Sequence, residues 1–224
     1  MLEEIRVAGG VEFAADPKGP RGEAKLRSGY AGIMGRLARH AGLRVFRVFG
    51  RRLEPQARVA GRGLDYRLLS KRDLLPLCAD ASLELSPSKV RAAYGRGDLC
   101  VGAFERGVLA GYCWFALAAA PHLDRAWLEF PPHVVYTYKS YVRPAFRGRG
   151  IAAAMYRVAD GLFLGRGRTH AVICVESHNR PSIAAAMRSG FSAAGYAAYF
   201  GDARLRAWCS RAAAGLGLRF YVPE

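Results

Sequence analysis

Residues 147–152 have the composition of a turn that binds an anion. In order they are Arg147, Gly148, Arg149, Gly150, Ile151 and Ala152. Glycine lets the backbone curl tightly, so that successive N–H groups can point in one direction. Apolar residues at 151, 155, 158, 159 and 162 predict a helix that begins near Ile151, and a helix start leaves about four N–H groups unpaired with a partial positive charge. The segment is therefore predicted to bind a phosphate or a pyrophosphate.

Two common phosphate-binding motifs do not fit this segment. A P-loop requires a lysine directly after its second glycine, and no lysine follows here. A dinucleotide-binding fold requires a third glycine where this chain has Ala153, and an acidic residue about 20 residues later at the end of a strand. The alternative to a phosphate site is a basic glycine turn that simply joins two core elements.

A second polar segment follows a predicted buried strand. Residues 170–175 form a short apolar run, which is typical of a strand with both faces covered. A helix is expected from about residue 180 to 188, with Gly190 at its end. Asn179 stands at the start of this helix, where it is either an N-cap or a ligand contact, and Ser182 is either a ligand contact or helix surface.

The elements that must position these segments mix strands and helices. Residues 134–142 are rich in β-branched and aromatic types and predict a strand that ends before Pro144. Upstream we expect a strand at 64–70, two short helices within 71–96, the second capped by Ser86, and antiparallel strands at 98–105 and 108–118. Downstream we expect strands at 194–200 and 218–222 that close the sheet, with a helix at 204–214.

Both polar segments match parts of one family signature. The pattern Arg-x-x-Gly-x-Ala at residues 147–152, with Val142 and Pro144 upstream, resembles the signature of the GNAT superfamily of acetyl-CoA-dependent N-acetyltransferases. Asn179, Ser182 and the pair Gly190-Phe191 match its second half. The resemblance covers roughly residues 62–200. It implies an α/β (α+β) fold of the GNAT type, with a mixed, mostly antiparallel central sheet flanked by helices and with strands 4 and 5 splayed apart.

The resemblance also implies a co-substrate and a set of residues that bind it. The co-substrate is acetyl-CoA or another acyl-CoA, with no metal, and the acceptor is most simply a small-molecule amine that attacks directly. The pantetheine arm would pair with the backbone of strand 134–142, and the pyrophosphate would take the N–H groups of the turn. The predicted cofactor-binding residues are Tyr141, Val142, Arg147, Gly148, Arg149, Gly150, Ile151, Ala152, Asn179 and Ser182.

The chain departs from the family at the expected proton donor. Many members carry a tyrosine seven residues after the asparagine, and this chain has Ala186 there. Candidate catalytic residues are therefore chosen by location alone: Tyr196 and Tyr199 as acids, and Glu129 and His133 as bases. Tyr138, Tyr141 and Glu176 are further possibilities. The departure leaves open a module that binds acyl-CoA without turnover.

Positive charge is concentrated near the N-terminus. The 224 residues carry a net charge of +16, and residues 18–62 contain twelve Lys or Arg but only Glu23 and Glu54 as acids. Two explanations are open for this surplus of positive charge. It reflects either an Arg-rich codon bias or a binding partner that is acidic, such as an anionic membrane surface or a large anionic acceptor; nucleic acid is the less favoured partner. We expect a basic extension at residues 1–60, made of a mobile lead-in, a basic amphipathic helix at 29–42 and a strand-like run at 43–49, and a GNAT acyltransferase domain at 61–224. The oligomeric state is not predicted.

Cysteine usage and hydropathy indicate the compartment. Five widely spaced cysteines without a CxxC pair predict free thiols and no metal site. The longest apolar run, residues 108–121, is shorter than the ~20 residues of a spanning helix. A cytoplasmic protein, in peripheral contact with a membrane at most, is expected.

Overall fold

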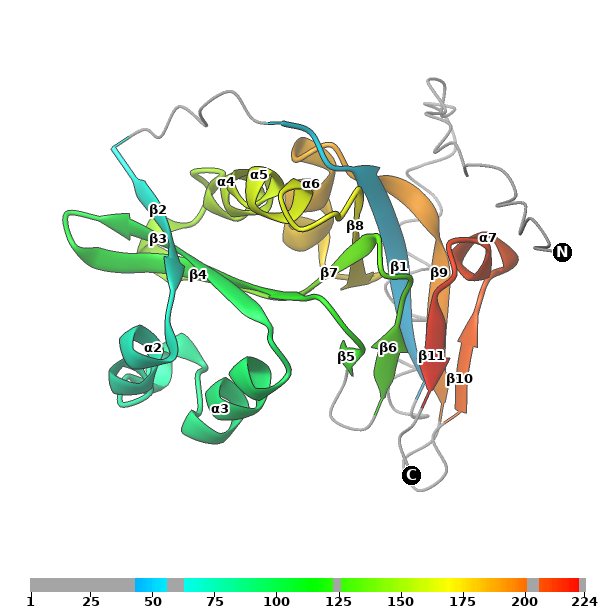
Figure 1. The fold of residues 1–224 in the computed structure, drawn as a ribbon, viewed down its shortest axis with the longest axis horizontal. Coiled ribbons are helices and arrows are strands. Elements are labelled where there is room, and N and C mark those ends of the chain that lie inside the picture. Colours follow the sequence, from blue (N-terminus) through cyan, green and yellow to red (C-terminus); the bar gives the residue numbers. More distant parts are fainter. Residues whose placement is uncertain (1–42, 56–62, 123–125, 201–205, 222–224) are drawn as a thin grey trace, which may run out of the picture.

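A computed structural model of the protein describes residues 43–55, 63–122, 126–200 and 206–221 (Figure 1). Its centre is an eight-stranded sheet with the order β10-β9-β1-β8-β7-β4-β3-β2. All neighbours are antiparallel except β7 and β8, which are parallel. The strands are β1 Leu43–Arg52, β2 Asp65–Leu69, β3 Leu99–Glu105, β4 Val108–Ala116, β7 Val134–Val142, β8 His170–Glu176, β9 Ser192–Phe200 and β10 Arg206–Cys209. The expected mixed, mostly antiparallel sheet is thus confirmed.

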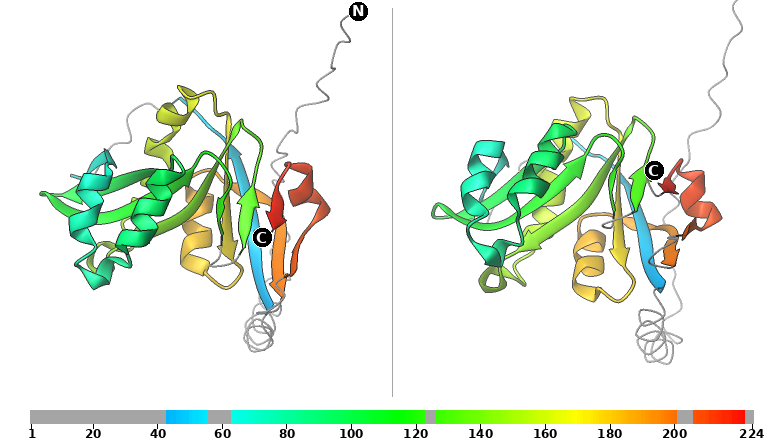
Figure 2. Two further views of the ribbon diagram at one scale, coloured as in Figure 1. Left: turned by 60° about the horizontal axis from the view of Figure 1, so that its bottom comes forward. Right: turned by 90° about the horizontal axis from the view of Figure 1, so that it is seen from below.

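Helices cover both faces of this sheet (Figures 1 and 2). On one face lie α2 (Lys71–Leu77), a 3₁₀ turn at Ala81–Leu83 and α3 (Pro87–Gly95), whose buried residues share a core cluster with β3 and β4. Ser86 caps α3 as predicted, since its side chain accepts a hydrogen bond from the Lys89 N–H. On the other face lie α4 (Ile151–Val158), α5 (Asp160–Leu164) and α6 (Arg180–Arg188).

The C-terminal elements differ from two predictions. The helix expected at 204–214 is the edge strand β10 followed by a short helix α7 (Arg211–Gly215), which Ser210 caps. The strand expected at 218–222 is β11 (Arg219–Tyr221), and it does not close the main sheet. It pairs with β6 (Trp127–Glu129), which also pairs with β5 (Ala120–Pro121), so these three strands form a separate small sheet.

The first strand in sequence lies inside the main sheet. β1 pairs along its length with β8 on one side and with β9 on the other. Residues 43–52 therefore do not belong to a basic N-terminal extension as expected, because strand pairing makes them part of the sheet. The lead-in and the basic helix expected before residue 43 lie outside the described residues. No helix in the described part of the chain is long and apolar enough to cross a membrane.

The strands β7 and β8 separate halfway along their length. Their pairing runs from Val134 opposite His170 to Thr137 opposite Ile173 and stops there. β7 nevertheless continues to Val142 and β8 to Glu176. Within the described ranges, one edge of β7 is therefore left without a strand partner between residues 138 and 142, and α4 and α6 flank this opening.

Candidate functional site

A pocket of about 400 Å³ opens where β7 and β8 separate. Its wall comes from the end of β7, the turn that follows, the start of α4 and one side of α6. The lining residues are Ser140, Val142, Phe146, Arg147, Gly148, Gly150, Ile151, Ala152, Ala153, Tyr156, Asn179, Pro181, Ser182, Ala185 and Arg188. Most of the predicted cofactor-binding residues are among them, although they come from two segments well separated in sequence.

The turn before α4 presents a row of unused backbone donors. Gly148 and Gly150 adopt left-handed φ values of 78° and 76°, which L side chains rarely do. Gly150 is also the N-cap of α4, where no side chain caps the helix. The first helical bond runs from the Ala154 N–H to the Gly150 carbonyl, and within the described residues the N–H groups at positions 148–153 have no hydrogen-bond acceptor. Such a cluster of donors at a helix start suits an anion.

Helix α6 forms the opposite wall. Asn179 is its N-cap, and the Asn179 Oδ1 accepts a hydrogen bond of 3.2 Å from the Ser182 N–H. Residues 181, 182, 185 and 188 are spaced three and four apart and therefore share the face that lines the pocket. Asn179 and Ser182 thus keep a structural role in the cap and a place in the pocket wall, and Arg188 adds a cation that the sequence analysis did not select.

The free edge of β7 offers the backbone of Ser140 and Val142 to the opening. The Arg143 N–H donates to the Ala110 carbonyl of the neighbouring chain segment, at 2.9 Å. In an antiparallel ladder the backbone N–H and C=O groups of alternate residues point to the partner strand. Like those of Arg143, the backbone groups of Tyr141 therefore point to β4, whereas those of Ser140 and Val142 point away from it. The Val142 carbonyl is reached by the Arg147 Nε at 3.1 Å.

Tyr141 therefore does not occupy the predicted position. Its backbone faces β4, its ring stacks on Tyr112 on the α2–α3 face, and its hydroxyl donates to the Ser82 carbonyl. Ser140 takes its place at the opening. The periodicity of a strand alone could not decide which of two neighbours faces the gap, because that depends on the register with β4.

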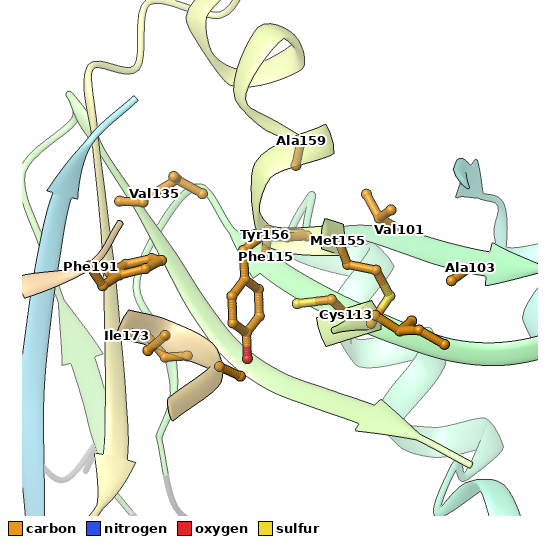
Figure 3. Close-up of a cluster of buried hydrophobic side chains, with 14 of the residues drawn as sticks. Val101, Ala103, Cys113, Phe115, Val135, Met155, Tyr156, Ala159, Ile173 and Phe191 are labelled. Carbon is orange, nitrogen blue, oxygen red and sulfur yellow. The ribbon is translucent and has the colours of Figure 1, made fainter. Parts of the chain in front are cut away.

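Tyr156 is a second pocket residue that the sequence analysis did not select. Its ring packs in the main core beside Met155 and Phe115 (Figure 3), and its hydroxyl lies 2.8 Å from the Ser140 Oγ. Burial raises the pKa of the Tyr156 phenol, so the group keeps its proton. The apolar pattern of α4 gave no sign of this contact, which depends on how α4 crosses β7.

Arg149 belongs to the turn but is engaged outside the pocket. Its guanidinium pairs with Glu105 at 2.5 Å and lies over the Phe146 ring. This pairing raises the pKa of Arg149 and lowers that of Glu105. Only the backbone N–H of Arg149 remains available at the turn.

The four candidate acids and bases lie away from the pocket. Tyr196 is exposed on β9, which β1 separates from β8. Tyr199 is buried between the two sheets against Phe46 and His122, and its hydroxyl has no partner among the described residues. Because β1 fills the place beside β8, strand β9 cannot bring either tyrosine to the opening.

The two candidate bases lie near the start of β7, whereas the turn follows its end. Glu129 sits in the small sheet and pairs with Arg219 at 2.6 Å. The His133 ring is exposed and 5.7 Å from the His170 ring. Glu176 pairs with Arg44 at 3.1 Å, and Ala186 is fully buried. Among the described residues no three His, Cys, Asp or Glu side chains gather as a metal site.

A family profile and several solved structures resemble the chain. The acetyltransferase (GNAT) family profile matches residues 70–191. A GCN5-related N-acetyltransferase from Sphaerobacter thermophilus shares 17% identity with a TM-score of 0.51, over 74% of this chain and 54% of that one. A GNAT-family protein from Novosphingobium aromaticivorans DSM 12444 shares 18% identity with a TM-score of 0.49, over 70% of this chain and 65% of that one.

A third structure, the aminoglycoside N-acetyltransferase AAC(6′)-Iy in complex with CoA, shares 18% identity with a TM-score of 0.46, over 57% of this chain and 91% of that one. The chain spans 65% and 54% of the length of the Novosphingobium and Sphaerobacter proteins. At these identities the Sphaerobacter structure supports the fold alone. No curated protein has a sequence that matches this chain.

Proposed function

The chain belongs to the acetyltransferase (GNAT) family, and from that premise we propose that it transfers an acyl group from an acyl-CoA to an amine. Acetyl-CoA is the simplest donor and a small-molecule amine the simplest acceptor. The observation that carries the proposal is the run of N–H groups at positions 148–153 without an acceptor among the described residues; all but residue 149 line the pocket in front of α4.

The chemistry of the pocket fits the diphosphate of CoA. Backbone donors at a helix start favour an anion without needing a side-chain charge. Arg147 and Arg188 also line the pocket, one from each wall. A Cβ atom built on Gly148 or Gly150 meets no atom within 4 Å, so these glycines leave room in front of the donors.

The free edge of β7 fits the pantetheine arm. An extended chain of amides can add to an unpaired strand edge as another strand would. Counted back along β7 from the turn, Val142 is the first residue whose backbone faces the opening, and Ser140 is the next. In this arrangement the Ser140 N–H is the donor placed to stabilise negative charge on the thioester oxygen. The described residues that line the pocket include no cysteine, so we infer direct attack by the amine.

Substitution of Gly150 tests the proposal. The variant Gly150→Asp should reduce CoA affinity at least 100-fold in isothermal titration calorimetry, because its carboxylate repels the diphosphate and strains a left-handed residue. Gly167→Asp is the matched control, since Gly167 has a φ of 72°, an equally open Cβ position and no place in the pocket. Both variants carry the same backbone strain of about 1–2 kcal/mol, so only Gly150→Asp should lose binding.

Two outcomes would contradict the proposal: no saturable CoA binding by the natural chain, or equal affinity in the two glycine variants.

The buried Ala186 motivates a second candidate, a module that binds acyl-CoA without turnover. Release of free thiol from acetyl-CoA across a panel of amines separates the two, because a binding module releases none.

A further inference from the structure

Two hydroxyl groups meet in the pocket wall at the free edge of β7. The Ser140 Oγ and the Tyr156 hydroxyl are 2.8 Å apart, and both residues line the pocket. Tyr156 comes from α4 and is 1% exposed, whereas Ser140 is partly exposed. Either oxygen can be the donor in this contact. When the buried phenol donates, the Ser140 hydrogen is left free to point into the pocket.

The position of this pair corresponds to the reactive end of the pocket. The anion-binding turn follows Val142, and Ser140 is the next edge residue back along β7. At ~3.3 Å per residue, an extended arm that runs from the turn along this edge passes Val142 and then Ser140. The opening closes shortly beyond, where Thr137 pairs with Ile173. The sulfur of a bound thioester must therefore lie in the part of the pocket that Ser140 lines.

As far as the structure describes the chain, no other hydroxyl of the pocket wall lies at that end. The remaining one, Ser182, belongs to the first turn of α6 beside Asn179. Further along α6 the pocket wall is Ala185, and its neighbour Ala186 is fully buried. Among the described residues, helix α6 therefore supplies no hydroxyl beyond Ser182, and its one charged residue in the pocket wall is Arg188, about one turn further along than Ala185.

We propose that the Ser140 hydroxyl is a catalytic residue that donates a hydrogen bond to the CoA sulfur, and that Tyr156 is its positioning residue. This inference rests on the proposed function. The Tyr156 O–H donates to the Ser140 Oγ, which leaves the Ser140 hydrogen free to point into the pocket. Hydrogen bonds in such a chain strengthen one another, and a bond to a charged acceptor is stronger than a bond to a neutral one.

The reaction step balances without a covalent enzyme intermediate. The amine nitrogen forms a bond to the acyl carbon, and the bond between that carbon and sulfur breaks. Its electron pair leaves on sulfur as a thiolate, which Ser140 stabilises. The proton lost by the amine passes to solvent, and the Ser140 and Tyr156 hydroxyls keep theirs.

The thiol of bound CoA tests this assignment without any acceptor. Because Ser140 stabilises the thiolate over the thiol, the pKa of CoA bound to the natural chain should lie about one unit below that of free CoA, a tenfold shift. The titration is followed by the ultraviolet absorbance of the thiolate, with desulfo-CoA complexes as blanks. Ser140→Ala and Tyr156→Phe should each return the thiol toward its free value, while Ser140→Thr should keep the shift.

Tyr94→Phe is the control, since it removes a tyrosine hydroxyl that also makes a hydrogen bond, to the Leu69 carbonyl, but outside the pocket. It should leave the thiol pKa unchanged. An unshifted thiol in the natural chain, or an unchanged shift in Ser140→Ala and Tyr156→Phe while CoA still binds, would overturn this assignment and leave the proposed function intact. Failure of the natural chain to bind CoA would overturn both. With an acceptor in hand, Ser140→Ala should lower kcat about 10- to 100-fold at unchanged KM for the acyl-CoA.

Discussion

The carboxyl group of Asp98 is almost completely removed from solvent at the start of β3. It is 1% exposed, accepts a hydrogen bond from Arg96 at 2.6 Å and another from the Tyr138 hydroxyl at 3.0 Å. Its Oδ1 atom has no partner within the described part of the chain. Burial raises the pKa of Asp98 more than its neighbours lower it, because desolvation penalises the charged form.

This raised pKa predicts the sign of a pH effect on stability. The contribution of the Asp98 titration to the free energy of unfolding is fully present below the pKa of the unfolded state, about 3.9. It is lost as pH rises through the higher pKa of the folded state. Asp98→Asn removes this titration, so the unfolding free energy of the natural chain minus that of the variant should fall between pH 4 and pH 8. Urea unfolding at several pH values measures the difference.

Asp73→Asn provides a control of opposite sign. Hydrogen bonds from the Ser70 side chain and backbone hold the pKa of Asp73 below its usual value. The unfolding free energy of the natural chain minus that of Asp73→Asn should therefore rise with pH as the Asp73 carboxyl ionises. A flat difference for Asp98→Asn would contradict the account of its burial.

Single residues of the site were predictable from sequence only where a motif fixes the backbone. Gly148, Gly150 and Asn179 stand at conformations or caps that only a few residue types supply, so their positions could be predicted. Ser140 and Tyr156 could not be predicted, because their contact arises from the crossing of α4 over β7. The predicted acids and bases stay without structural support, since their choice rested on chain order rather than on strand order.

At the scale of elements, one buried ion pair fastens β1 to the helices that carry the site. The Arg51 guanidinium pairs with both oxygens of Asp160, at 2.6 and 2.5 Å, and donates to the Tyr156 carbonyl at 2.9 Å. Both side chains are nearly inaccessible, and the guanidinium also lies over the Phe191 ring. The pair thereby links the first strand to the junction of α4 and α5.

Breaking this pair from one side should be costly. Arg51→Met leaves the Asp160 carboxylate buried without its partner and is expected to reduce the unfolding free energy by about 3–5 kcal/mol. The double variant Arg51→Met with Asp160→Leu should recover much of that loss, because no charge is then buried. Guanidinium denaturation monitored by circular dichroism provides both values.

The control is Arg44→Met on the same strand. Arg44 pairs with Glu176 at the surface, and such pairs contribute about 0–1 kcal/mol. Equal losses of unfolding free energy in Arg51→Met and Arg44→Met would show that the buried pair contributes no more to stability than the surface pair.

Elements with strong local signals were predictable, and those that depend on pairing were not. Ser86, Pro144 and the apolar run at 170–175 mark their elements directly, and the structure has α3, β7 and β8 there. Residues 206–209 lie in an Arg- and Ala-rich stretch that favours helix, yet they pair with β9 as an edge strand. Tertiary pairing overrides local propensity in so short a segment.

At the scale of the whole molecule, the position of β1 decides where the N-terminus can be shortened. Removal of residues 1–40 keeps every described strand, so we expect this variant to stay folded and to retain the CoA affinity of the natural chain. Removal of residues 1–53 deletes β1 and opens the sheet between β8 and β9. That variant should be largely insoluble or unfolded. A folded variant without β1 would contradict the structural role given to this strand.

The same strand order sets the sequence of events during synthesis. Residues 65–142 supply four neighbouring strands from one continuous stretch, so that half of the sheet can assemble as it leaves the ribosome. β1 is made before them, yet its two neighbours begin only at His170 and Ser192. Contacts between residues so far apart close large loops and form late. The nascent chain therefore carries β1 with both edges unpaired until residues 170–200 have been made, and an unpaired strand of this kind is exposed to aggregation and to holding chaperones.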